Sequence, residues 1–149
     1  MTQDLRELAT QRSRLHTHHR SQRPLSSEYD LVGLAGEKAF AERYGYNVDR
    51  ELRPGGDGRI DFETPVGTVD VKTARKAYNL LREQGKPHAD LLVLAEYDDA
   101  TEQAVLLGWE WDREMLKCPA KDFGYGIVNH YLHRSRLRSI DLLDDLMRQ

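Results

Sequence analysis

Residues 59–76, RIDFETPVGTVDVKTARK, contain two short runs in which apolar and polar residues alternate around a central Pro-Val-Gly. Successive side chains of a strand point to opposite faces, so Ile60 and Phe62 share one face of the first run. Val69 and Val71 likewise share one face of the second run. Burying these four side chains together requires the two runs to pair as a β-hairpin in a defined register. The pattern therefore predicts a half-buried hairpin.

The same alternation leaves three charged residues for the other face of this hairpin. Any loop with an even number of residues places Asp61, Asp70 and Lys72 together, opposite the apolar side chains. Pro65 cannot adopt the positive φ of the favoured two-residue type I′ loop, so we expect a four-residue loop over 65–68. That register sets Asp61 opposite Lys72 and diagonal to Asp70, about 7–8 Å away. A two-residue loop would set Asp61 directly opposite Asp70.

Two like charges that face each other across a sheet are destabilising and need compensation. One compensation is a solvated face on which Lys72 screens both carboxylates. The other is a bound divalent cation, because hard ions such as Mg²⁺ favour oxygen ligands and use one or two carboxylates together with phosphate oxygens. The hairpin alone leaves both alternatives open.

A third carboxylate lies on a preceding helical segment. Gly33, Glu37, Phe40 and Tyr44 follow one another at spacings of four, three and four residues, which places them on one face of a helix. Glu37 then lies on a face that is otherwise apolar or closely packed. A glutamate there either reaches water at the edge of the stripe or needs a partner, since buried carboxylates are seldom left alone. We expect Glu37 to point towards the polar face of the hairpin.

The order of the other elements indicates an α/β (α+β) domain with a mixed central sheet of about four to five strands flanked by helices. Residues 1–25 are expected to form a basic helical arm, and residues 26–149 a single domain. In chain order we expect a helix at 4–19, a helix from Ser26 or Ser27 to Tyr44 ended by Gly45, an edge strand at 46–52, a helix or irregular segment at 73–87, a buried central strand at 89–97, a strand at 102–111 paired with it, a short helix at 112–117, a loop at 121–131, and a closing helix at 139–149 capped by Ser139.

The composition is that of a globular protein of 149 residues, with 39% hydrophobic and 32% charged residues. The longest apolar run, ADLLVLA, is too short to cross a bilayer, and the first residues lack the apolar core of a signal peptide. The single cysteine, Cys118, excludes an internal disulfide and agrees with a reducing cytoplasm. We therefore expect a cytoplasmic protein without a membrane partner.

The net charge of −3 does not by itself indicate a nucleic-acid-binding protein. The charge is unevenly distributed, because residues 1–23 carry five arginines against two acidic residues, Asp4 and Glu7. Such an arm either steers phosphate backbones or is an ordinary solvated segment.

Taken together, these motifs resemble the PD-(D/E)xK nuclease superfamily, which includes restriction endonucleases, junction resolvases and phage exonucleases. The resemblance is carried by GLAGE on a helix, then GDGRIDF, then VDVK on the next strand, and it spans about residues 28–143. The later segments also resemble small phage- and plasmid-type members. This chain departs from the pattern in two places: Gly58, Arg59 and Ile60 precede Asp61 without a proline, and Asp70 replaces the commoner glutamate. Asp57 is therefore a rival for the role of Asp61.

The resemblance implies a restriction-endonuclease-like fold and a metal-dependent deoxyribonuclease. Asp61, Asp70 and the backbone carbonyl of Val71 would hold Mg²⁺ or Mn²⁺, with Glu37 contributing directly or through water. Lys72 would orient and help deprotonate the attacking water and stabilise the transition state. The expected catalytic residues are thus Glu37, Asp61, Asp70 and Lys72.

The expected partner is DNA, as duplex, end or branched structure, and a homodimer is possible because two strands need two cuts. Backbone contacts are expected from two basic clusters that follow the candidate metal strand and close the chain. Two alternatives stay open: a non-catalytic nucleic-acid-binding domain with the same fold, and an unrelated domain whose acidic face is plain solvated surface. The residues expected to contact nucleic acid are Arg75, Lys76, Arg82, Arg134 and Arg136.

Overall fold

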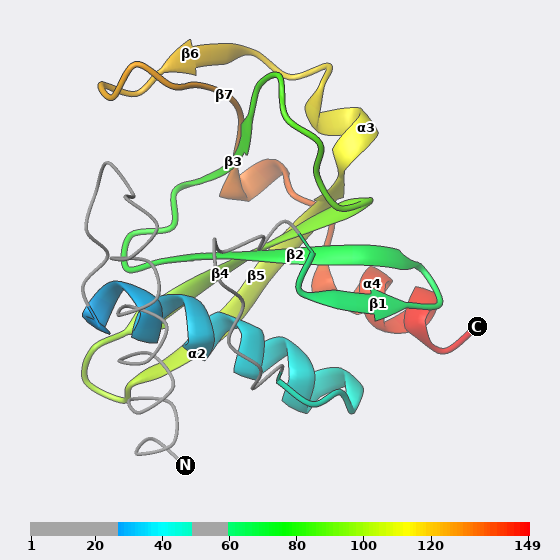
Figure 1. Cartoon of the computed structure of the whole chain (residues 1–149). Helices are drawn as coiled ribbons and strands as arrows, with labels where there is room; N and C mark the ends of the chain where they lie inside the picture. The colour runs from blue at the N-terminus through cyan, green and yellow to red at the C-terminus, as the bar shows by residue number, and fades with distance from the viewer. Residues whose placement is uncertain (1–26, 49–59) are drawn as a thin grey trace.

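The computed structural model describes residues 27–48 and 60–149, with the side chains of 27–30 excepted (Figure 1). The predicted arm at 1–25, its helix at 4–19 and Asp57 lie outside the described residues. Most of the predicted edge strand at 46–52 does too, and its first three residues, 46–48, are not strand.

The chain folds into two sheets and flanking helices, which confirms the predicted α+β class. The first sheet has four strands in the order β1-β2-β4-β5, with β2 and β4 parallel and the other pairs antiparallel. The second is antiparallel with three strands in the order β3-β7-β6. The elements are α2 (Ser27–Tyr44), β1 (Phe62–Thr64), β2 (Gly67–Ala74), β3 (Asn79–Glu83), β4 (Leu91–Asp98), β5 (Gln103–Trp111), α3 (Asp112–Met115), β6 (Ala120–Asp122), β7 (Val128–His133), the 3₁₀ helix η1 (Arg134–Arg136) and α4 (Ile140–Met147).

Most predicted elements are present. Helix α2 ends at Tyr44, and Gly45 follows with a φ of 79°, the left-handed conformation that terminates helices. Strand β4 is buried along most of its length, and β5 pairs with it as an antiparallel neighbour. Helix α4 begins after Ser139, whose hydroxyl accepts a hydrogen bond from the Leu142 N–H at 3.2 Å.

The second sheet was not predicted. The segment at 73–87, predicted as a helix or irregular segment, contains β3, and the segment at 121–131, predicted as a loop, contributes to β6 and β7. Strand β3 pairs with β7 through Leu80 and Leu132, more than fifty residues apart. No local pattern indicates such a pairing, because it depends on where the rest of the chain brings the two segments.

The β1–β2 hairpin has the register of a two-residue loop and not that of the predicted four-residue loop. Thr64 pairs with Gly67, so the loop contains two residues, 65–66, and the four-residue prediction is wrong. Pro65 keeps a negative φ, and the positive φ of 138° falls on Gly67 instead. Glycine adopts such angles without steric cost. The loop therefore closes tightly although a proline begins it.

The expectation that Ile60 shares the core with Phe62 is also wrong. Ile60 is 42% exposed, whereas Phe62 is 6% exposed. Strand β1 begins only at Phe62, and Asp61 before it lies in a bend. The alternation of a regular strand therefore does not extend back to Ile60.

The four-stranded sheet lies between α2 on one face and the second sheet on the other (Figure 1). The space between the two sheets is filled by a separate apolar cluster that includes Leu80, Leu92, Leu94 and Met115. The cluster on the α2 side is the largest and consists of Phe40, Ala41, Phe62, Val69, Val71, Leu91, Val93, Ala95, Trp109 and Leu143.

The C-terminal segment is fixed to both layers by polar contacts. Trp109 is fully buried, and its backbone exchanges two hydrogen bonds with Arg138, at 3.1 and 2.9 Å. Arg43 of α2 binds Asp144 of α4 through two hydrogen bonds, of 2.8 and 2.6 Å, and holds the pKa of that carboxyl below its usual value. Within residues 27–48 and 60–149, no helix is long and apolar enough to span a membrane.

Helix α2 approaches β2 most closely at Gly36. A Cβ added there would lie 1.8 Å from the Thr73 hydroxyl oxygen and 3.0 Å from the Thr73 Cβ. A Cβ added at Gly33, one turn earlier, would meet nothing within 4 Å. The close helix–sheet contact therefore depends on Gly36 and not on Gly33.

Gly36→Ala is expected to destabilise the fold by about 1–3 kcal/mol, because α2 must move away from β2 to admit the methyl group. Gly33→Ala is the matched control and is expected to stabilise by up to about 1 kcal/mol through helix propensity. Urea denaturation measures both. Equal effects of the two substitutions would contradict the close approach, and Thr73→Ala should partly rescue Gly36→Ala.

Candidate active site

Asp70 and Lys72 lie on the face of β2 that points away from α2. They pair in register with Leu92 and Leu94 of β4, two residues of the apolar cluster between the sheets. Val71, between them, points to the opposite face and belongs to the core under α2. The predicted alternation along this strand is therefore present.

Asp61 occupies the end of the β1–β2 ladder. Its N–H donates to the Val69 carbonyl at 2.8 Å, and its Oδ2 accepts a hydrogen bond from the Val71 N–H at 2.8 Å. The carboxylate thus takes the place that a main-chain carbonyl has in a continuing ladder. Because the N–H and C=O of a strand residue point to the same neighbour, the Val71 carbonyl faces this edge as well. Asp61 and Val71 together mark one edge position of the sheet.

The register sets Asp61 beside Asp70, and the electrostatics reflect it. The pKa of Asp61 is raised well above its usual value, first by burial of the carboxyl group and then by the negative charges of Glu37 and Asp70. The adjacent Asp70 carboxyl group thus raises the pKa of Asp61 further. The hydrogen bond from Val71 acts in the opposite direction. Two neighbouring carboxyl groups therefore act on Asp61.

Asp70 is 3% exposed, and its compensation comes from Lys72. The Lys72 ammonium nitrogen lies 2.8 Å from Asp70 Oδ2. The angles of this ion pair are not those of a hydrogen bond, so Oδ2 has no hydrogen-bond donor among the described residues. The Lys72 side chain is 32% exposed and extends from the buried carboxylate towards solvent.

Glu37 is half-buried on α2, directly after the glycine that allows the close approach to β2. Phe40 on the same helical stripe is fully buried, as the spacing predicted. Gly36, not Gly33, brings the helix close enough for the Glu37 charge to act on Asp61. Because α2 covers the Val71 face of β2, the expectation that the helix presents Glu37 to the polar face of the hairpin is wrong. Glu37 acts instead on Asp61 at the edge of the sheet.

The oxygen atoms that could bind a metal at this edge fit a hard divalent cation in part. They are carboxylate oxygens and one strand carbonyl, and Asp70 Oδ2 is buried without a hydrogen-bond donor. Among the residues that the structure describes, no three His, Cys, Asp or Glu side chains form a complete ligand group. The residues therefore fit an ion held by two carboxylates, with water and substrate oxygens completing its shell, as Mg²⁺ prefers.

The first predicted basic cluster does not form one surface. Arg82 is 6% exposed and binds Asp112 through two hydrogen bonds, of 2.7 and 3.1 Å. Arg75 pairs with Asp99 and lies 5.6 Å from the centre of the Tyr97 ring. Lys76 is exposed at the end of β2. Arg82 is therefore buried in an internal ion pair and is not part of the surface.

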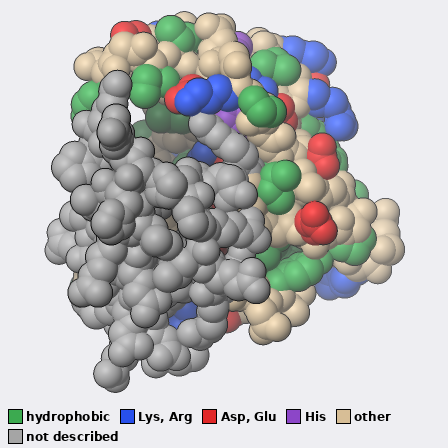
Figure 2. Space-filling model, viewed as in Figure 1, with side chains coloured by type: hydrophobic (Ala, Val, Ile, Leu, Met, Phe, Trp, Pro, Cys, Tyr) green, Lys and Arg blue, Asp and Glu red, His purple; other side chains and the backbone are tan. Residues whose placement is uncertain are grey.

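The second basic cluster divides as well. Arg134 pairs with Glu96 of β4 at 3.0 Å. Arg136 is exposed and lies near Cys118, whose pKa it lowers slightly against the larger effect of burial. On the face drawn in Figure 2, Lys and Arg side chains gather mainly over the part that the second sheet occupies in Figure 1, with acidic side chains among and below them.

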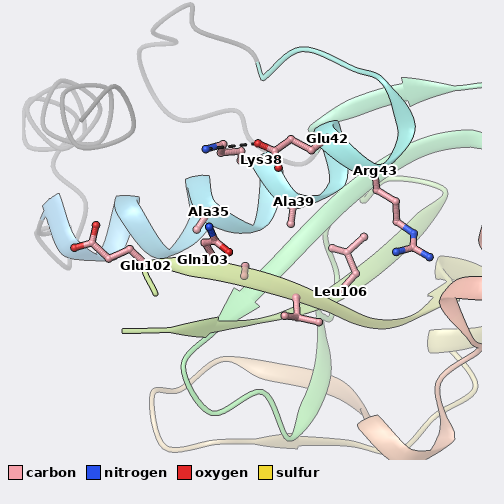
Figure 3. A pocket seen from close by; sticks show the side chains of 10 residues that line it. Ala35, Lys38, Ala39, Glu42, Arg43, Glu102, Gln103 and Leu106 are labelled. Carbon is pink, nitrogen blue, oxygen red and sulfur yellow. Dashed lines mark ion pairs between the residues drawn. The ribbon is translucent and has the colours of Figure 1, made fainter. Parts of the chain in front are cut away.

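A groove of about 540 Å³ lies elsewhere, between α2 and β5 (Figure 3). Its charged lining contains both signs, including Lys38 and Glu42, which pair at 3.5 Å. The groove is not lined by the predicted catalytic residues, which are Glu37, Asp61, Asp70 and Lys72. The groove is therefore separate from the candidate site.

Two acidic residues near the site were not predicted. Glu96 accepts hydrogen bonds from the Ala77 N–H and from Arg134, at 3.2 and 3.0 Å. Asp90 accepts from the Thr68 N–H and hydroxyl, at 2.9 and 3.1 Å, and so holds the hairpin loop against the start of β4. Glu96 could have been found as the one charged residue within the apolar run 91–97.

The fold and site define an α+β protein with clustered carboxylates and a lysine at one edge of a mixed sheet. No family model, curated protein or solved structure matches the chain.

Replacing Asp61 by Asn is expected to stabilise the protein at neutral pH in the presence of chelator. The pKa of Asp61 is higher in the folded than in the unfolded state, so its contribution to stability falls as pH rises from about 4, the unfolded value, and levels off above the folded pKa. Asn keeps an acceptor for the Val71 N–H but removes the repulsion. The stability difference between variant and wild type should therefore shrink as pH is lowered.

Chemical denaturation between pH 4 and pH 8 measures this difference, with Glu63→Gln on the exposed side of β1 as the control. A difference that is constant across the pH range would contradict the assigned electrostatics.

Proposed function

We propose that this protein is a divalent-metal-dependent nuclease that hydrolyses DNA phosphodiester bonds. The observation that carries the proposal is the placement of Asp61 beside Asp70 at the end of the hairpin, with Lys72 paired to Asp70 at 2.8 Å. Two adjacent carboxylates have mutually unfavourable charges. A divalent cation bound at this edge would compensate both charges.

The order of these residues along the chain supports the same proposal. A helical glutamate, a carboxylate before a strand, and Asp-x-Lys on the next strand reproduce the pattern that resembles PD-(D/E)xK nucleases. Asp61, Asp70 and the Val71 carbonyl would hold Mg²⁺ or Mn²⁺, with Glu37 directly or through water. When bound, the ion supplies polarisation of the scissile phosphate and offsets charge that develops on its oxygens.

Lys72 is the residue we assign to the attacking water. Its ammonium group is anchored by a buried carboxylate and reaches solvent, so it has a defined position at the mouth of the site. There it would orient the water and stabilise negative charge in the transition state, while the proton of the metal-bound water would pass to bulk solvent. Asp70 thus has two roles in the proposal, as a ligand and as the group that positions Lys72.

A non-catalytic nucleic-acid-binding domain is the second candidate. It is favoured by one observation: Lys72 already neutralises Asp70, so the cluster is partly compensated without an ion.

The nuclease proposal also includes a cytoplasmic location, which is based on the single cysteine. It further includes a homodimer, which would allow both strands to be cut.

Asp70→Ala and Lys72→Ala are each expected to reduce DNA cleavage by at least about a hundredfold while the fold is kept. The measurement is incubation with plasmid, linear duplex and branched DNA in Mg²⁺ and in chelator. Lys117→Ala is the control, since Lys117 is an exposed lysine in an unrelated ion pair with Glu114. Wild-type activity in Lys72→Ala would refute its role, and binding without cleavage in the wild type would favour the second candidate.

Addition of Mn²⁺ or Ca²⁺ is expected to raise the melting temperature of the wild type. At one hundred times the dissociation constant, binding to the folded state contributes about 2.7 kcal/mol. Asp61→Asn and Asp70→Asn should abolish the shift, because each removes a charged ligand, whereas Glu63→Gln should retain it. A metal-independent melting temperature in the wild type would argue against an ion at this edge.

A further inference from the structure

The β3–β7 ladder continues by one residue beyond the strands, at the end near the candidate site. Asn79 pairs with His133, and the Arg134 N–H donates to the Tyr78 carbonyl at 2.8 Å. Tyr78 and Arg134 are therefore opposite one another in register, close enough for their side chains to interact. The Arg134 side chain points to the first sheet, where it pairs with Glu96, and the Tyr78 side chain is mostly exposed beside it.

Arg134 is connected to the first sheet through Glu96. Its guanidinium lies 3.0 Å from Glu96 Oε2, which also accepts the Ala77 N–H at 3.2 Å. Glu96 pairs in register with Ala74 of β2, two residues beyond Lys72 on the same face. Two residues of strand span about 6–7 Å. Arg134 is therefore held next to the Asp70–Lys72 row, at the end of β2.

Both side chains at this position reach solvent. Tyr78 is 57% exposed, and the Arg134 side chain is 35% exposed. A guanidinium group has five N–H donors, and within the described residues Glu96 is the only acidic partner of Arg134. The remaining donors and the tyrosine ring match the two recognisable parts of a nucleotide, its phosphate and its base.

We propose that Tyr78 and Arg134 form a subsite for one unpaired nucleotide next to the scissile phosphate. Arg134 binds the phosphate, and Tyr78 stacks on the base. Glu96 is a positioning residue that fixes the guanidinium. An aromatic ring can stack on a base only where the face of that base is exposed, so the subsite selects single-stranded or frayed DNA over closed duplex. This inference rests on the proposed nuclease function and adds its substrate class.

The first test measures the binding of fluorescently labelled DNA by anisotropy in chelator, where the proposed cleavage does not occur. The probes are a single strand of twelve nucleotides and a blunt duplex of the same sequence. Tyr78→Leu should weaken binding of the single strand by about tenfold and change duplex binding by less than about twofold. Tyr78→Phe, which keeps the ring, should bind both probes like the wild type.

The second test uses a pair of matched arginines. Arg134→Ala should weaken single-strand binding by about tenfold and reduce the slope of log affinity against log salt by about one. Arg148→Ala, at an exposed arginine that pairs with Asp145 in the closing helix, should change neither. Glu96→Gln should weaken binding less than Arg134→Ala, because Gln still accepts hydrogen bonds but no longer pairs its charge.

The subsite is overturned if Tyr78→Leu weakens single strand and duplex equally, if it weakens neither, or if Arg148→Ala matches Arg134→Ala. Circular dichroism and melting curves establish that each variant is folded. Cleavage by the wild type in Mg²⁺ is measured in parallel, and its absence counts against the nuclease function alone. The binding comparison in chelator retains its meaning in either case.

Discussion

The carboxylate of Asp61 takes a hydrogen bond from the Val71 N–H where a main-chain carbonyl would otherwise continue the hairpin. This bond ends the β1–β2 ladder and holds Asp61 beside Asp70. Burial and the neighbouring charges oppose ionisation of Asp61 and raise its pKa. The rest of the molecule keeps the two groups together in spite of these effects.

Packing on both faces of the first sheet supplies the restraint. On one face, Gly36 lets α2 come close enough to β2 for Glu37 to act on Asp61. On the other face, the second sheet covers β4 and brings Arg134 to Glu96. The candidate site therefore lies at an edge whose position is fixed by two layers that contact different faces of the same strands.

The charged residues outside this edge are mostly used within the fold. Arg82 is buried in its pair with Asp112, and Arg43 joins the two terminal helices of the described chain through Asp144. The number of arginines in the sequence is therefore larger than the number whose side chains are available to contact phosphate. The structure reduces two predicted basic clusters to a few positions near the end of β2.

Within the regular helices and strands, sequence alone determined which residues share a face, because these periodicities are properties of the local chain. Ile60, which precedes β1, did not follow the pattern. The sequence correctly placed Asp70 and Lys72 opposite the core of β2 and the apolar stripe of α2 around Phe40. The hairpin register was not fixed by the sequence pattern: the loop has two residues, and a long-range hydrogen bond from the Thr68 N–H to Asp90 holds it in place. Tertiary structure also decided the second sheet, because strands more than fifty residues apart pair only once the layers between them have packed.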